Sequence, residues 1–309
     1  MRSDEIYYSE PVFRPPSEAY SLLIQATEGC TYRCSFCVPY LDKKFKIRAT
    51  EEIKGDLETA KRIYGPDVRR IFFLDGNAMV MPTAKLREIT EYAVQEFNDL
   101  ERVSVYAHAK DILKKSDEEL KSLAEAGLKM AYIGMETGND ELLKKIGKHQ
   151  TADDTVEAFH KCFRSGITPS GTIILGLAGN DRDIARQHMK DSAALVNRAS
   201  PVHVIKGKNP PLWYISCLAL MITPGTQIHK DTAEGRFVRA TTDEILEEMK
   251  IFMENISDEV QNCVFRSNHP SNYLAIKGNL CQDKHEILDL INRNLQDKTD
   301  IRPENFRAL

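Results

Sequence analysis

The chain lacks long apolar runs and an excess of one charge, and these absences exclude several classes of protein. No apolar run reaches the roughly 18 residues of a transmembrane helix, so the sequence predicts no membrane span. The amino-terminal stretch MRSDEIYYSE is too polar for a secretory signal. A net charge of −4 gives no general attraction to nucleic acid or to anionic lipid. We therefore predict a cytoplasmic protein without membrane or nucleic-acid partners.

Cysteine is scarce outside one short loop. The stretch CTYRCSFC holds Cys30, Cys34 and Cys37. The other cysteines are single and scattered: Cys162, Cys217, Cys263 and Cys281. Seven is an odd number, and the spacing is not that of a disulfide framework, so the set fits a reducing compartment better than a secreted scaffold. The clustered three therefore indicate a bound metal or cofactor.

Strand-like runs alternate with helical patterns along most of the chain. The six strand-like runs are SLLIQ, RRIFFL, RVSVYA, LKMAYIGM, ITPSGTIIL and PLWYISCLALMI. Helical patterns between and after them cover residues 53–64, 84–97, 116–127, 152–165, 181–198, 243–255 and about 283–295. The third of these opens with Ser116 and Glu119, which form a capping box. A hydrophobic share of 42% is enough for a sizeable core. Such alternation predicts a parallel sheet with helices packed outside it.

We expect one α/β domain, a partial (β/α)6 TIM-like barrel. Its parts are an extended lead-in over residues 1–20, the (β/α)6 core over 21–240 and a C-terminal helical extension over 241–309. In such folds the functional residues gather at the carboxyl ends of the strands. The polar and glycine-rich tails EGC, DGN, HAK, METG and LGLAG fall there, so five strand ends are expected at one mouth.

Three thiolates in one loop are compatible with more than one kind of site. A structural zinc ion takes four ligands, usually from two cysteine pairs, so zinc would need His or Asp from elsewhere in the chain. A [4Fe–4S] cluster is normally held by four cysteines. With three cysteines, one iron has no protein ligand and stays open to a small molecule. Ordinary reduced cysteines are the remaining alternative.

The spacing Cys30-x3-Cys34-x2-Cys37, with Phe36 before the last cysteine, resembles the signature of the radical S-adenosylmethionine (radical SAM) enzymes. The similarity extends from about Phe13 to the end, and includes FRPPSEA, YIGMETGNDELLKKIGK, TPGT and SNHPSNY. These stretches most resemble the branch of coproporphyrinogen-dehydrogenase-like and BchE-like Fe–S oxidoreductases.

The resemblance implies an activity and two cofactors. In this family a [4Fe–4S] cluster on three cysteines binds SAM through its unique iron. One-electron reduction cleaves SAM to methionine and a 5′-deoxyadenosyl radical, which abstracts hydrogen from a small-molecule substrate. The cofactors carry the chemistry, while the protein binds and orients them and excludes water. An electron donor such as flavodoxin or ferredoxin is expected.

The family pattern also implies contacts to the adenosine part of SAM. Phe36 matches an aromatic residue that lies beside the adenine, and Ile174 matches an apolar adenine contact. Strand alternation places Thr172 on the same face as Ile174. Glu136, in GMETG, matches an acidic residue that accepts hydrogen bonds from the ribose hydroxyls. Ordinary packing for the apolar residues and a solvated strand-end acid for Glu136 are the alternatives.

The turn Asp75, Gly76 and Asn77 matches a glycine-rich turn whose backbone takes the amino group of SAM, although only one glycine is present. A plain turn that ends a strand is the alternative. The chain also departs from some relatives. It has no fourth cysteine directly after Cys37, no further CxxC pair, and about thirty residues before the motif, too few for a cobalamin-binding domain.

Substrate-binding residues are harder to predict. Lysines beside the only tryptophan, Trp213, suggest an anionic substrate, and the stretch 266–274 suggests a cap over the mouth or a structural clamp. The catalytic candidates from these stretches and from the third strand end are His108, Lys110, Lys206, Lys208, His269 and Tyr273.

Two alternative functions stay open at this point. One is a SAM cleavage that transfers the aminocarboxypropyl group. The other is a non-catalytic Fe–S or zinc protein, which would bind metal but would not cleave SAM.

Overall fold

The structure of the chain is a computed structural model that describes residues 5–207 and 209–308. Eight strands of these residues form a mostly parallel sheet in the order β1-β4-β5-β6-β7-β8-β9-β10. Contacts divide the chain into two compact units. Unit 1 consists of Met1–Arg33, Pro39–Ile133 and Lys161–Pro169. Unit 2 consists of Cys34–Val38, Gly134–His160 and Ser170–Leu309.

Unit 1 contains parallel strands with fully buried centres. Its sheet strands are β1 (Leu22–Gln25), β4 (Arg70–Leu74), β5 (Arg102–Ala107) and most of β6 (Leu128–Glu136). In β4 every residue from Ile71 to Leu74 is completely buried, as expected for a strand covered on both faces. The short strands β2 (Thr27–Glu28) and β3 (Lys46–Ile47) pair with each other.

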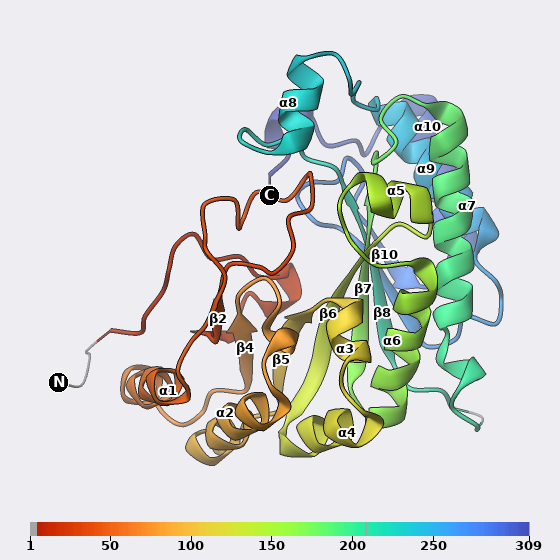
Figure 1. Cartoon of the computed structure of the whole chain (residues 1–309). Coiled ribbons are helices and arrows are strands. Elements are labelled where there is room, and N and C mark those ends of the chain that lie inside the picture. The colour runs from red at the N-terminus through yellow and green to blue at the C-terminus, as the bar shows by residue number, and fades with distance from the viewer. Residues whose placement is uncertain (1–4, 208, 309) are drawn as a thin grey trace. The chain divides into compact units, whose positions relative to one another are not determined.

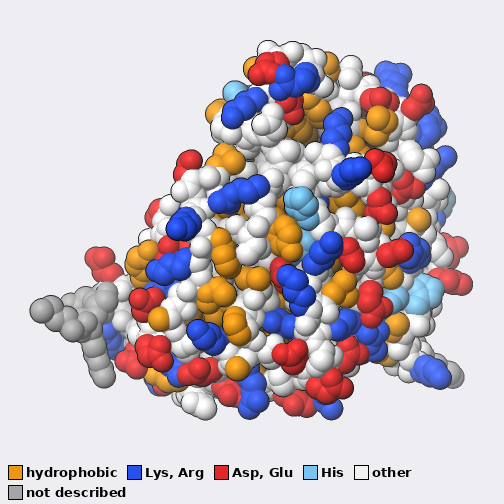
Figure 2. Space-filling view, viewed as in Figure 1, with side chains coloured by type: hydrophobic (Ala, Val, Ile, Leu, Met, Phe, Trp, Pro, Cys, Tyr) orange, Lys and Arg blue, Asp and Glu red, His pale blue; other side chains and the backbone are white. Residues whose placement is uncertain are grey.

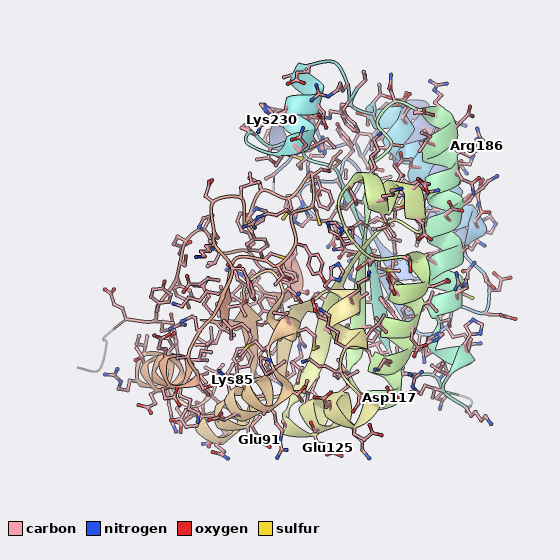
Figure 3. The ribbon with its side chains drawn as sticks, viewed as in Figure 1. Lys85, Glu91, Asp117, Glu125, Arg186 and Lys230 are labelled. Carbon is pink, nitrogen blue, oxygen red and sulfur yellow. The ribbon has the colours of Figure 1, made fainter. Side chains whose placement is uncertain are left out.

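Amphipathic helices cover this part of the sheet (Figure 1). They are α1 (Thr50–Tyr64), α2 (Thr83–Glu96), α3 (Ala109–Leu113) and α4 (Asp117–Ala126), with 3-10 turns η1 (Pro16–Glu18) and η2 (Ala78–Val80). The predicted capping box of α4 is present, since Ser116 and Glu119 exchange hydrogen bonds between side chain and backbone. The labelled side chains of α2 and α4 point outward, away from the strands (Figure 3).

Unit 2 continues the pattern with longer helices. Its strands are most of β7 (Thr168–Leu175), β8 (Trp213–Ala219), β9 (Cys263–Ser267) and the antiparallel β10 (Ile276–Asn279). Its helices are α5 (Asp140–Lys145), most of α6 (Ala152–Ser165), α7 (Arg182–Ala199), α8 (Gln227–Ala233), α9 (Thr242–Asn255) and α10 (Lys284–Asp297), with 3-10 turns η3 (Pro201–His203) and η4 (Glu304–Phe306). Helix α9 packs between α7 and α10 (Figure 1).

The predicted α/β class and the six strands followed by helices are confirmed. Strands β9 and β10 were not expected, because the C-terminal segment has a helical pattern on both sides of them and each strand is short. The division into residues 1–20, 21–240 and 241–309 stays a prediction.

None of the described helices is both long and apolar enough to cross a membrane. On the face drawn in Figure 2, acidic and basic side chains of the described residues are interspersed.

Candidate active site

The motif cysteines differ from most of the others in exposure. Cys30, Cys34 and Cys37 are half-buried thiols, whereas three of the scattered cysteines are fully buried. Burial raises the pKa of Cys162 to about 12 and also raises the pKa of the other two, Cys217 and Cys263. A thiol must lose its proton to bind metal, so burial keeps these three inert. The thiols that a ligand can reach are therefore concentrated in the motif.

In unit 1, Asp75 follows β4 and is completely buried. Its Oδ2 accepts hydrogen bonds from Gln25 Nε2 (3.2 Å), the backbone N–H of Gly29 (3.1 Å) and Lys43 Nζ (3.0 Å). Its Oδ1 has no hydrogen-bond partner in the described part of the chain. Burial raises the pKa of this carboxyl, and the bond and charge of Lys43 oppose that rise. Asp75 thus ties the β1 and β4 ends to Gly29, directly before Cys30.

Gly76 leaves room for the first cysteine. A Cβ at residue 76 would lie 2.8 Å from the Cβ of Cys30 and 2.5 Å from Cε2 of Tyr40. Any side chain here would collide with these neighbours, so only glycine lets Cys30 and Tyr40 pack this closely against the turn.

Asn77 joins the β4 end to the β5 end and to the cysteine loop. Its Oδ1 accepts from the backbone N–H of His108 (3.1 Å), and its Nδ2 donates to Asp111 Oδ2 (2.6 Å) and Thr31 Oγ1 (3.3 Å). The ring of His108 stacks on that of Tyr32, with centroids 3.7 Å apart. These contacts hold the first half of the loop without any metal.

The two candidates after β5 differ in exposure. His108 is 3% exposed, and its Nδ1 accepts from the backbone N–H of Lys110 (3.2 Å), which caps α3. Lys110 is exposed. Sequence reasoning missed Asp111, which is buried and organises the neighbouring Asn77 and Lys114.

In unit 2, the second half of the cysteine loop is held by its backbone. Ser35 donates its N–H to Ile146 O (2.9 Å), and Ser35 O accepts from the N–H of Ile228 (3.0 Å). The N–H of Cys37 donates to Cys34 O (3.0 Å), which closes a turn between these two cysteines. The turn orientation is therefore set by α8 and by the residue after α5.

The predicted adenine contacts Phe36 and Ile174 share one apolar cluster. Phe36 packs on a set of buried side chains that contains Ile174, Leu177 and Leu220. Thr172, two residues before Ile174 on β7, is half-buried and lies 3.0 Å from Ser216 on β8, Oγ1 to Oγ. The structure thus brings Phe36 and Ile174 into one cluster, although they are 138 positions apart in the sequence.

Glu136, at the end of β6, forms an ion pair that the sequence did not reveal. Lys148 Nζ donates to Glu136 Oε1 at 2.6 Å, and Glu136 is 6% exposed. A Cβ at residue 134 would lie 2.1 Å from that Oε1 and 2.5 Å from the lysine Nζ, so Gly134 provides the space for the pair. Gly134, two residues before Glu136, was the only sign in the sequence that space is needed beside this acid.

The backbone at Glu136 is strained. Its φ is +62°, and the N–H of Thr137 donates to Met135 O (2.8 Å), so residues 135–137 form a γ-turn with positive φ at the centre. This kind of turn is rare and strained for an L-residue. Such outliers tend to mark functional positions when the surrounding structure holds them in place.

Of the two lysines before β8, the structure describes only Lys206. Lys206 is exposed in the loop that precedes β8, at the amino end of that strand, and Lys208 lies outside the described residues. Trp213 is completely buried, with its Nε1 donating to Gln261 O and its ring against Phe159. The tryptophan is thus a core residue.

The stretch 266–274 meets the carboxyl end of β8. Asn272 accepts from the N–H of Ala219 (2.7 Å) and donates to Cys217 O (2.8 Å). The hydroxyl of Tyr273 donates to Glu304 Oε2 (2.6 Å) and accepts from Arg239 and Arg307. These contacts tie the stretch to β8 and to the C-terminal segment, and its role as a cap or a clamp stays a prediction.

His269 belongs to the same stretch and is half-buried. Its Nδ1 accepts from the N–H of Ser271 (3.1 Å). Burial and then the charge of Arg302 lower the pKa of this imidazole, so it is a neutral base at neutral pH.

The family follows from comparison with known proteins. The sequence profile of the radical SAM superfamily matches residues 24–191, which is more than half of the 309 residues. The chain belongs to the radical SAM superfamily. The match includes the cysteine loop and the ends of β4, β6 and β7.

Relatives within the superfamily are distant. An uncharacterized methyltransferase of Pyrococcus horikoshii is 22% identical over 163 residues, or 52% of this chain and 34% of the relative. The oxygen-independent coproporphyrinogen III oxidase of Paracoccus denitrificans is 26% identical over 185 residues, or 56% of this chain and 41% of the relative. The chain thus spans about a third to two-fifths of these two relatives.

A solved structure shows the same fold. The coproporphyrinogen III oxidase of Escherichia coli, a radical SAM enzyme, aligns with a TM-score of 0.54 at 15% identity. The alignment covers 76% of this chain and 52% of the oxidase. The predicted fold and the predicted resemblance to coproporphyrinogen-oxidase-like proteins are both confirmed.

Membership also confirms that the protein is an enzyme whose cofactors are a [4Fe–4S] cluster and SAM. The residues present fit these groups. The motif cysteines are half-buried, Gly76 lets Cys30 pack directly against the turn after β4, and Asp75 Oδ1 is a buried acceptor without a hydrogen-bond partner among the described residues. Each cysteine of such a cluster binds a different iron, so the three sulfurs need not meet at one point as the ligands of a single metal ion would.

Proposed function

We propose that Cys30, Cys34 and Cys37 hold the [4Fe–4S] cluster of this radical SAM enzyme. The observation that carries the proposal is that the matched profile, the motif spacing and the accessible thiols coincide in one loop. Contacts around Tyr32 and Ser35 hold both halves of the loop. A zinc protein or a non-catalytic carrier would not require the strained acid at the end of β6.

We also propose that the residues matched to the family's SAM contacts bind SAM in this protein. The adenine would lie against Phe36 and Ile174, where an apolar cluster excludes water and favours a flat ring. Glu136 would accept hydrogen bonds from the ribose hydroxyls through Oε2, because Lys148 already occupies Oε1. The turn at Gly76 would receive the amino group, with the buried acceptor of Asp75 nearby in the sequence.

When bound and reduced by one electron, the two cofactors supply a carbon-centred radical that removes hydrogen from the substrate. The residues of this chain bind and orient them. Lys148 holds the Glu136 carboxylate in one direction, so its second oxygen is already aimed before SAM arrives. The buried cluster around Ile174 keeps water away from the adenosine.

The substrate is a small molecule, and a negative charge on it stays a prediction. The catalytic candidates His108, Lys110, His269 and Tyr273 stay predictions, and Lys206 is set apart from them because it lies at the amino end of β8. A flavodoxin or ferredoxin as electron donor also stays a prediction.

The test is cluster assembly followed by SAM cleavage. Cys34→Ala should lose all cluster iron after anaerobic reconstitution, while Cys281→Ala, which alters a half-buried cysteine outside the motif, should keep it. Iron analysis and visible absorption measure both. With dithionite and SAM, the parent protein should then release 5′-deoxyadenosine.

Other results would contradict this function. Full iron in Cys34→Ala would refute the ligand assignment, and a colourless protein with zinc would refute the cluster. Release of methylthioadenosine in place of 5′-deoxyadenosine would identify aminocarboxypropyl transfer. A loaded cluster that never cleaves SAM would identify an electron carrier.

A further inference from the structure

His188, on α7, joins the ends of two strands. It is completely buried, its Nε2 lies 3.1 Å from Ile174 O, and its Nδ1 lies 2.6 Å from Thr137 Oγ1. A carbonyl oxygen can only accept, so Nε2 carries the proton and Nδ1 accepts from the threonine hydroxyl. One neutral imidazole therefore bridges the residue after Glu136 and the backbone of Ile174 itself.

The hydrogen-bond chain around this imidazole is complete. The N–H of Asn139 donates to Thr137 Oγ1 (2.9 Å), which leaves the threonine proton for His188. Burial lowers the pKa of the imidazole to about 4, so the neutral form persists at physiological pH. His188 therefore keeps both hydrogen bonds, to Thr137 Oγ1 and to Ile174 O, at neutral pH.

Two further residues of α7 hold the same turn. Ser192 Oγ accepts from the N–H of Gly138 (3.0 Å), and Asp191 Oδ2 accepts from Asn139 Nδ2 (2.7 Å). A Cβ at Gly138 would lie 2.1 Å from the backbone oxygen of Asp191, so the turn lies flush against the helix. Positions 188, 191 and 192 share one helix face, which makes three anchors for residues 137–139.

These anchors explain how the strained γ-turn at Glu136 persists. A positive φ at a residue other than glycine is unfavourable and survives only where the surrounding contacts over-determine it. The three anchors begin at the residue directly after Glu136, so they fix the direction in which the turn presents its carboxylate.

We propose that His188 is a positioning residue for SAM: by bridging Thr137 and Ile174 O, it sets the spacing between the ribose contact of Glu136 and the adenine contact of Ile174. This role rests on the SAM site proposed above. Both contacts must reach the same adenosine, so a shift of a fraction of an ångström at one strand end loses affinity. His188 itself need not touch SAM.

The experiment measures SAM affinity in the reconstituted holoenzyme by equilibrium dialysis. His188→Gln can keep an N–H donor for Ile174 O but has no acceptor at the position of Nδ1, while Thr137→Val removes the same bond together with the acceptor of the Asn139 N–H. We expect each to raise the Kd for SAM about tenfold with an unchanged cluster spectrum. The double variant should bind no worse than Thr137→Val alone, because the bond to His188 is already missing in that single variant.

Val196→Ala is the matched control, since it removes buried volume from the same helix two turns away. It should lower the melting temperature and leave the Kd unchanged. Equal Kd values for parent, His188→Gln and Thr137→Val would overturn the proposal, and so would a loss of affinity in Val196→Ala equal to that in His188→Gln. If His188→Gln fails to fold, Thr137→Val decides.

Glu136→Ala distinguishes a failure of the His188 proposal from a failure of the proposed SAM site. A weakened Glu136→Ala beside an unaffected His188→Gln would overturn only the bridge. An unaffected Glu136→Ala would overturn the SAM site itself, and the bridge with it. An independent check is a ¹⁵N-histidine NMR spectrum, in which a His188 protonated at Nδ1 would also overturn the assignment.

Discussion

Two strand ends carry a buried carboxylate beside a lysine, and the two carboxylates are used differently. After β4 in unit 1, Asp75 gathers Lys43, a glutamine side chain and a backbone N–H on one oxygen, and no part of it is exposed. At the end of β6 in unit 2, Glu136 has Lys148 on one oxygen and sits at the centre of a strained turn. The same sequence signal, an acid at the end of an apolar strand, thus gives a fully buried carboxylate with several partners in one place and a carboxylate in a strained turn with one lysine partner in the other.

The lysines differ as well. Lys43 also donates to the backbone oxygens of Ser9 and Pro11, at 2.5 Å each, so it holds the amino-terminal segment on Asp75. Breaking such a buried pair by removing one partner leaves an uncompensated charge. The unit 1 pair should therefore matter mostly for stability, and the unit 2 pair mostly for binding.

The largest expected effect is on stability. Lys43→Met should destabilise the protein by about 3–5 kcal/mol, because Asp75 stays buried without its cation. Lys148→Met should cost less, about 1 kcal/mol, because Glu136 keeps 6% of its surface exposed whereas Asp75 has none exposed. Urea unfolding at neutral pH measures both. Equal losses would mean that the two pairs have the same role and would break the comparison.

A third buried carboxylate sharpens the comparison because it has no such partner. Glu248, on α9, accepts from the N–H of Gly176 at 2.6 Å, and its Oε1 has no hydrogen bond within the described residues. Burial raises its pKa to about 8, and the bond from Gly176 opposes that rise. The folded protein thus keeps a proton that the unfolded chain releases near pH 4.5.

Stability linked to Glu248 is therefore fully present below about pH 4.5 and is lost as the pH rises towards 8. The loss amounts to about 4 kcal/mol at pH 8. Glu248→Gln should remove this slope, so its stability relative to the parent should be higher at pH 8 than at pH 5. Urea unfolding across that range checks it, with the exposed Glu247→Gln as control. An unchanged slope would show that Glu248 is ionised in the folded state.

The smallest effect in free energy concerns SAM binding. Glu136→Ala should raise the Kd for SAM ten- to a hundredfold, because one or two charge-assisted hydrogen bonds of about 1.5–3 kcal/mol in total are lost. The cluster spectrum should not change. Glu141→Ala, an exposed acid on α5, is the control and should bind SAM like the parent. If Glu136→Ala also binds like the parent, Glu136 is a structural acid like Asp75.

Much of the fold could be predicted from local patterns. Alternating strand and helix signals identified the six strand–helix pairs, and Ser116 with Glu119 marked the start of α4, because these features depend on residues a few positions apart. The family signature is local too, since a loop of eight residues contains all three cysteines. The two short strands after α9 could not be predicted, because strand β9 pairs with β8 across almost fifty residues of sequence.

The candidate site also has features that depend on residues close in the sequence and features that depend on distant ones. The sequence by itself determined the cysteine loop and the acid at the end of β6, because each lies in one short motif. Only the tertiary structure revealed that Lys148 pairs with Glu136, that Gly134 makes room for them, and that His188 bridges Thr137 to Ile174 O. Lysine and histidine at those positions have no periodic signature, and their roles arise where packing brings a helix face against two strand ends.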